Sequence, residues 1–186
     1  GGNLLAGGIQ AAGSALVGLG RFAIGAGVKM EQTRISFQTM MASVSKGNAL
    51  FAETAEFANV TPFSTEGVQK AGRTLLAFGI EGKKVLPTLS ALGDISAGTG
   101  KDLSELGVIY GQIKGAGRLM GQDLLQLINA GFNPLQTISE RTGESMAALK
   151  KRMSEGAISF EEVQLAFSDA TSEGGRFYQM SEKQSK

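Results

Sequence analysis

The amino-acid sequence predicts an all-α, multi-helix domain of about eight short helices, preceded by an apolar helix rich in glycine and alanine. Apolar residues recur at the spacing of one helix face along most of the chain, and alternating strand patterns are scarce. Cap residues, glycines and prolines separate the periodic stretches. With 186 residues and 42 % hydrophobic residues, the chain is large enough to bury the core of one domain.

We divide the chain into three parts: a Gly/Ala-rich apolar helix over residues 1–30, a helical domain over residues 31–180, and a polar, frayed tail over residues 181–186. The first 20 residues carry no charge. Their length alone would fit a membrane span, but their many Gly, Ala, Ser and amide residues gain little from lipid. We therefore favour a helix that needs a protein partner, and we expect helix to continue over residues 28–44.

Break signals place the next two helices. Pro62 biases Thr61 away from helix, and Ser64 or Thr65 can cap the helix that follows. We expect that helix to end at Gly79 and Gly82 and to bury one face, formed by Val68, Ala71, Leu75 and Phe78. The helix after it should carry Pro87 in its first turn and direct a second apolar face inward, formed by Val85, Leu89, Leu92 and Ser96.

A glycine ladder marks the following helix. Asp102 is a suitable N-cap for it, and its core face comprises Leu103, Leu106, Tyr110 and Ile113. Gly107, Gly111 and Gly115 recur every four residues on the same helix. Because side chains are missing along this stripe, the backbone of another helix can approach it closely. We predict helix packing along these glycines.

Shorter helices complete the domain. One over residues 123–130 should stop at Gly131, and the next should begin with Asn133 as N-cap and Pro134 at its first position. Gly143 and Gly156 should end two further helices. Ser159 and Glu162 have the spacing of a capping box before the last helix, which should bury Phe160, Val163, Phe167 and Ala170 and close at Gly174 and Gly175.

Composition excludes several kinds of chemistry. The chain has no His and no Cys, so it lacks Ser-His-Asp and Cys-His catalytic devices and thiolate metal sites. The net charge of +1 provides no basic surface for nucleic acid. The run from Gly115 to Gly121 lacks the glycine spacing and the preceding strand of a dinucleotide-binding loop. We expect no catalytic residue, cofactor or metal.

Two short stretches partly resemble the catalytic motifs of a class of murein-cleaving enzymes. Lytic transglycosylases carry a catalytic Glu followed by Ser and, later, a Gly-Leu-Met-Gln stretch. Here Glu144-Ser145 comes after Leu119-Met120-Gly121-Gln122, in the reversed order and with altered letters. A helix dipole explains Glu144 in a first helical turn, and no second carboxylate has the spacing of a paired acid and base. The short cationic run from Lys150 to Arg152 is interpreted as a solvated helix end.

Several motifs in one order resemble the N-terminal domain of phage tail tape measure proteins over roughly residues 35–180. The first are Ala77-Phe78-Gly79 and Leu86-Pro87-Thr88-Leu89-Ser90-Ala91-Leu92-Gly93-Asp94. The central ones are Tyr110-Gly111-Gln112-Ile113, Gly117-Arg118-Leu119-Met120-Gly121-Gln122-Asp123-Leu124 and Gly131-Phe132-Asn133-Pro134-Leu135. The last are Gly156-Ala157-Ile158-Ser159-Phe160, Ala166-Phe167 and Gly174-Gly175-Arg176-Phe177-Tyr178. Each motif is weak alone, but their succession is specific.

The resemblance implies a structural domain of a phage or prophage tail protein that acts in tail assembly and in setting tail length inside the tail tube. It also implies a location in the virion tail, and in the host cytoplasm during assembly. The partners we expect are further copies of the chain and other tail proteins, such as the tube protein, the assembly chaperones and the tail tip. A murein-degrading or membrane-active module of the same tail protein is the alternative.

Overall fold

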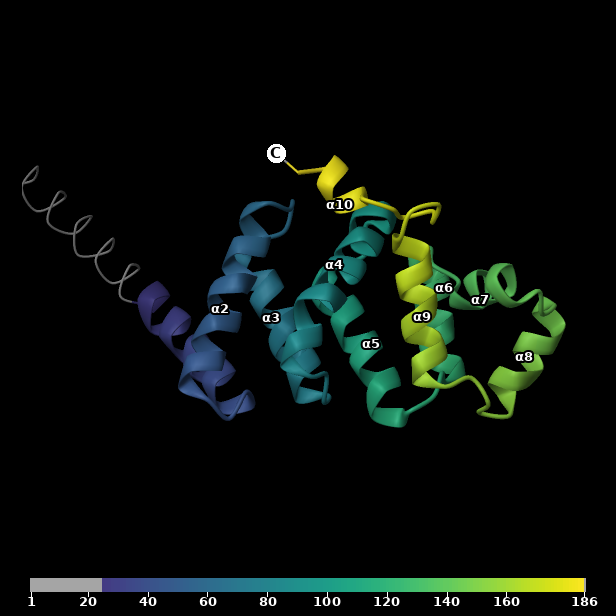
Figure 1. The fold of residues 1–186 in the computed structure, drawn as a ribbon, viewed down its shortest axis with the longest axis horizontal. Coiled ribbons are helices and arrows are strands. Elements are labelled where there is room, and N and C mark those ends of the chain that lie inside the picture. Colours follow the sequence, from purple (N-terminus) through teal and green to yellow (C-terminus); the bar gives the residue numbers. More distant parts are fainter. Residues whose placement is uncertain (1–24, 186) are drawn as a thin grey trace, which may run out of the picture.

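The computed structural model describes residues 25–185, which are almost entirely helical (Figure 1). Residues 25–40 form the first helix in this part. The nine that follow are α2 (Val44–Asn59), α3 (Thr65–Ala77), α4 (Gly82–Thr99), α5 (Leu103–Ala116), α6 (Gly121–Ala130), α7 (Pro134–Thr142), α8 (Met146–Ser154), α9 (Phe160–Thr171) and α10 (Met180–Lys183). Within this part no strand forms, and one isolated bridge joins Arg118 to Ser159. The predicted all-α fold is confirmed.

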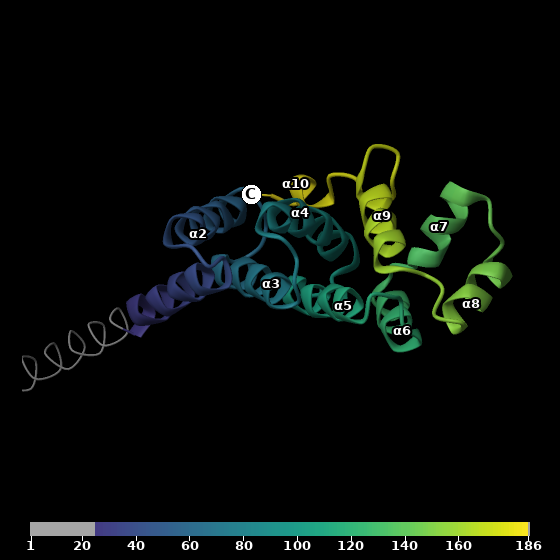
Figure 2. The same ribbon diagram turned by 60° about the horizontal axis from the view of Figure 1, so that its bottom comes forward.

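The helices form an elongated body (Figures 1 and 2). The helix of residues 25–40 projects from one end, next to α2 and α3, and α7 and α8 lie at the other end. Helices α3, α4 and α5 occupy the middle, and α9 connects them to α7. The chain then returns, so that α10 packs on α4.

One continuous hydrophobic core runs through the body. Its deepest side chains include Phe37 from the first helix and Leu75, Leu89 and Ile113 from the middle helices, all without exposed surface. A row of edge-to-face aromatic rings extends the core toward α7 and the C-terminal segment: Phe160, Tyr110, Phe167, Phe132 and Phe177, with neighbouring ring centroids 4.9–5.8 Å apart. Such pairs contribute about 0.5–1.5 kcal/mol each beyond burial.

The predicted helix caps are largely confirmed. The Asp102 carboxylate accepts hydrogen bonds from the backbone N–H groups of Ser104 and Glu105. The Asn133 side chain accepts from the N–H of Leu135, and Pro134 is the first residue of α7. The Ser159 hydroxyl accepts from the N–H of Glu162. Gly131 and Gly143 end α6 and α7 in the left-handed conformation that glycine adopts without strain.

Three predictions about the first half of the chain were wrong. Residues 28–44 are not one helix, because the chain turns at residues 41–43 with Ala42 in a left-handed conformation. Gly82 begins α4 instead of ending α3, because Gly79 alone reverses the chain (φ 95°) and Ile80 is already buried. Pro87 lies inside α4, beyond its first turn, where its missing N–H leaves a helical carbonyl without its usual donor.

The expected frayed tail was also wrong. The backbone N–H and the hydroxyl of Ser181 donate hydrogen bonds to Oδ1 of Asp94, at 3.0 and 2.8 Å, and both residues are buried. The side-chain amide of Gln184 donates to the carbonyl of Ala97 at 2.8 Å. Helix α9 ends at Thr171, before the two glycines, and the loop leads directly into α10. The prediction for residues 1–24 lies outside the described residues.

Candidate functional site: a glycine-lined helix contact and its surroundings

The three ladder glycines of α5 lie against α3. At Gly107, an added Cβ would stand 3.5 Å from the Cβ of Ala71, an ordinary contact. At Gly111, an added Cβ would overlap the ring of Phe78, coming within 2.7 Å of its Cγ. At Gly115 the nearest ring carbon of Phe78 would be 3.4 Å away. The Phe78 ring therefore occupies the space that a side chain at Gly111 would fill, and it lies within contact distance of one at Gly115.

The connection from α5 to α6, residues 117–120, contains the start of the motif Gly117–Leu124 and is hydrogen-bonded to the loop before α9. Gly117 ends α5 in the left-handed conformation (φ 76°). The N–H of Leu119 donates to the carbonyl of Ile158 at 2.9 Å, and the N–H of Phe160 donates to the carbonyl of Gly117 at 3.0 Å. The side chain of Arg118 lies over Gly156, where an added Cβ would meet its Cδ at 3.2 Å. These residues hold the α5–α6 connection against the loop before α9.

The other motif residues divide into exposed and buried ones. Gln112 and Gln122 are exposed, and Gly121 opens α6. Asp123 is buried, and burial raises the pKa of its carboxyl above the ordinary value. Phe132 is buried in the aromatic row, while Asn133 and Pro134 start α7. These positions contribute caps, turns and core packing, and they do not converge on one site.

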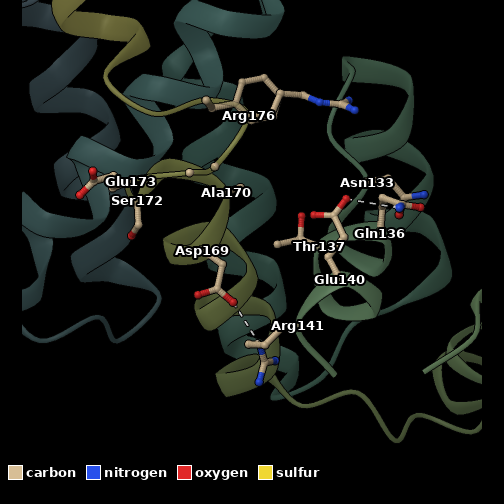
Figure 3. Close-up of a pocket in the computed structure, with 13 residues that line it drawn as sticks. Asn133, Gln136, Thr137, Glu140, Arg141, Asp169, Ala170, Ser172, Glu173 and Arg176 are labelled. Atoms are coloured by element: carbon tan, nitrogen blue, oxygen red, sulfur yellow. Dashed lines mark hydrogen bonds and ion pairs between the residues drawn. The ribbon is translucent and has the colours of Figure 1, made fainter. Parts of the chain in front are cut away.

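One surface pocket, of about 630 Å³, lies between α7, the end of α9 and the loop that follows α9 (Figure 3). Nε of Arg141 is 3.1 Å from a carboxylate oxygen of Asp169 across this pocket. The amide of Gln136 donates to Glu140 at 3.4 Å. Arg176 extends from the loop toward α7 (Figure 3). The lining mixes both charge signs with amides and hydroxyls, so its geometry suits polar contacts.

Glu144, which stands in a stretch that partly resembles a catalytic motif, is held in an ion-pair network. It precedes Ser145, the N-cap of α8, so it lies just outside the helical turn we predicted for it. Arg152 pairs with Glu144 at 2.9 Å and with Glu162 at 2.6 Å, and it also donates to the carbonyl of Ala157. Arg152 is therefore not a solvated helix end. Glu162 pairs with Arg152, and this bond, which no local motif indicated, ties α8 to the start of α9.

Two further grooves lie on the described surface. One of about 560 Å³ lies between α4 and α9, and one of about 430 Å³ lies between the first helix and α3. Among residues 25–185, no cluster of three or more acidic side chains could hold a metal ion. Within the same described part, no helix combines the length and the apolarity that a membrane crossing needs.

A comparison with protein families gives a match to tape measure proteins over residues 21–186. The chain belongs to the tape measure protein family. The match begins earlier than the resemblance found by motif, so it includes the helix that projects from the body as well as the glycine contact and α10. Comparisons with curated proteins and with solved structures give no match. A tape measure protein is a structural component of phage tails. This agrees with motif residues that form helix caps, turns and core contacts.

Proposed function

We propose that this tape measure domain acts in assembly of the phage tail and in setting tail length, as a folded part of a chain held inside the tail tube. The family match over residues 21–186 is the observation that carries this proposal. The domain contributes packing surfaces and no chemistry. It is present in the host cytoplasm during assembly and then in the virion tail.

The partners we propose are further copies of the chain and neighbouring tail proteins. The helix of residues 25–40 supports this, because large apolar side chains on it are exposed: Val28 by 51 %, Met30 by 58 % and Ile35 by 48 %. It follows directly on the uncharged, apolar residues 1–20. A helix of that composition lacks a polar face to solvate, so burial between subunits is its favourable environment.

Electron microscopy of phage particles tests the assembly role. The parent gene would carry Gly111→Leu, which places a side chain where the Phe78 ring lies, or Gly107→Ala, which fits beside Ala71, as the matched control. The phage are grown at a temperature above the melting temperature of the Gly111→Leu domain and below that of the natural domain. There we expect Gly111→Leu to reduce the yield of full-length tails and Gly107→Ala to leave it unchanged. Normal yield and length with the unfolded Gly111→Leu domain would refute a role in assembly.

A further inference from the structure

Helix α6 carries an apolar stripe that is partly exposed in the described part of the chain. Gly121, Leu125 and Ile128 are spaced so that they share one face of the helix. Leu125 is 58 % exposed and Ile128 is 41 % exposed, although both are large and apolar. Met120, the residue before α6, is 41 % exposed. The opposite face is the one that packs inward on the body, through Asp123, Leu124 and Leu127.

The stripe itself contains no charged residue, and Arg118 lies at its edge, where Nε donates to Sδ of Met120 at 3.5 Å. Asp123 is the one charged residue of α6, and it is buried on the inner face. The exposed neighbours of the stripe, Gln122 and Asn129, are neutral amides. Scattered exposed apolar residues are normal, but adjacent ones on a single uncharged helix face are typical of a contact surface. A charged partner would lose water over Leu125 and Ile128 without gaining a counter-charge from α6 itself.

The distribution of charge along the sequence indicates which segment covers the α6 stripe. The two longest stretches without a charged residue are residues 1–20 and residues 124–139, and the second contains Leu125 and Ile128. The first is rich in Gly and Ala and also carries Leu4, Leu5 and Ile9. A segment of small and aliphatic residues can lie close on a helix face and bury both surfaces without stranding a charge.

The position of the helix of residues 25–40 favours a contact between two copies of the chain over one within a single copy. The helix of residues 25–40 starts at the end of the body opposite α6 and α7, and it leads outward (Figures 1 and 2). Residue 25, to which the preceding segment is joined, therefore lies at the other end of the body from α6 of the same copy. A neighbouring copy has no such constraint. A contact between two different surfaces is heterologous, and it repeats from copy to copy until a ring closes.

We infer that residues 1–20 of one copy dock on the α6 stripe formed by Met120, Gly121, Leu125 and Ile128 of a neighbouring copy. This inference rests on the proposed self-association and specifies its two surfaces. Burying one Leu or Ile side chain is worth about tenfold or more in affinity. Leu125→Ser together with Ile128→Ser should therefore weaken association by roughly a hundredfold, if the two effects add. Leu165→Ser, which changes a comparably exposed leucine on α9, should leave association unchanged.

Cross-linking tests the contact directly, because the natural chain has no cysteine. Full-length Ala11→Cys protein is mixed with full-length Leu125→Cys protein, or with Leu165→Cys protein as the control, and oxidised mildly. The two partners carry tags of different size, so that mixed dimers are recognised on a gel. We expect a disulfide-linked mixed dimer with Leu125→Cys and none with Leu165→Cys.

Three other outcomes would overturn the inference, and light scattering on the unmodified full-length chain distinguishes them. If the chain associates but two Leu125→Cys proteins cross-link in preference to a Leu125→Cys and an Ala11→Cys protein, the α6 stripe of one copy contacts the α6 stripe of another. If the chain associates and the Leu125→Ser, Ile128→Ser variant associates equally well, the segment docks elsewhere. If the full chain is monomeric at every concentration and no cross-link forms, the proposed self-association fails together with the inference.

Discussion

The contact between Gly111 and Phe78 gives the sharpest prediction about stability. In Gly111→Leu, the new side chain must displace the Phe78 ring or push α3 and α5 apart, because a Cβ at this position already overlaps the ring. Overpacking of this kind costs about 1–3 kcal/mol, and the better helix propensity of leucine returns about 0.8 kcal/mol. The overlap reaches the base of the ring, which favours the upper half of this range. We expect a net loss of about 1–2 kcal/mol.

Thermal unfolding followed by circular dichroism measures this loss. For a protein of this size, 1 kcal/mol corresponds to roughly 2–4 °C, so the melting temperature should fall by roughly 2–8 °C. Gly107→Ala is the matched control on the same helix face. Its Cβ would meet Ala71 at an ordinary 3.5 Å, so it should gain up to about 1 kcal/mol from helix propensity and melt a few degrees higher.

A second substitution isolates the pair. Phe78→Ala alone should cost about 1–2 kcal/mol, because Phe78 is 36 % exposed and only the buried two thirds of its surface contributes hydrophobic stabilisation that the truncation removes. In that background Gly111→Leu should be neutral or stabilising, since the space has been vacated. The expected coupling between the two sites is about 1–3 kcal/mol. A Gly111→Leu protein that melts at or above the natural temperature, with no coupling to Phe78, would refute the packing argument.

Three further predictions concern polar groups. Burial raises the pKa of Asp123, so the folded state binds this proton more tightly than the unfolded state does, and the ionised carboxylate destabilises the fold at neutral pH. Asp123→Asn should therefore raise the melting temperature at pH 7. The difference in melting temperature between the variant and the natural protein should shrink as the pH falls through the pKa of Asp123 in the folded state. An equal difference in melting temperature at all pH values would contradict this. Arg152→Met should cost about 1 kcal/mol or more in urea unfolding by leaving Glu144 and Glu162 unpaired, whereas Lys83→Met, which breaks the exposed pair with Glu81, should stay within about 0.5 kcal/mol. Ser181→Ala removes the hydrogen bond from the hydroxyl of Ser181 to Asp94. It should speed amide hydrogen exchange in α10 and leave exchange in α5 unchanged. Equal protection of α10 in both proteins would show that this bond does not hold the helix.

Local signals were sufficient to predict the fold class and most helix starts. The caps at Asp102, Asn133 and Ser159 depend on residues within one turn, so their side chains and spacing are visible in the sequence. The turn at Ala42 could not be predicted in this way, because it uses a non-glycine residue in a left-handed conformation without a Gly or Pro signal. The start of α4 was missed because two glycines stood close together and only Gly79 reverses the chain.

Long-range contacts account for the remaining differences. The sequence showed the glycine ladder but not that Phe78 would cover Gly111. The bond between Ser181 and Asp94 joins residues 87 positions apart, and nothing near Ser181 distinguishes it from a polar tail. Arg152 was assigned to solvent because its partners Glu144 and Glu162 come from outside its helix. Such pairings follow from the packing of helices against one another and leave no periodic pattern.

The molar mass of the chain in solution tests the central claim, that this domain works by assembling with other copies, most directly. Light scattering would compare the full chain, of 19.3 kDa, with a version that lacks residues 1–20, over a wide concentration range. The shortened protein keeps every core side chain of the described part, since these begin at Phe37. We expect the full chain to run well above the mass of one copy, increasingly so with concentration, and the shortened protein to stay near that of a monomer. Two proteins that both run as monomers throughout would contradict the claim.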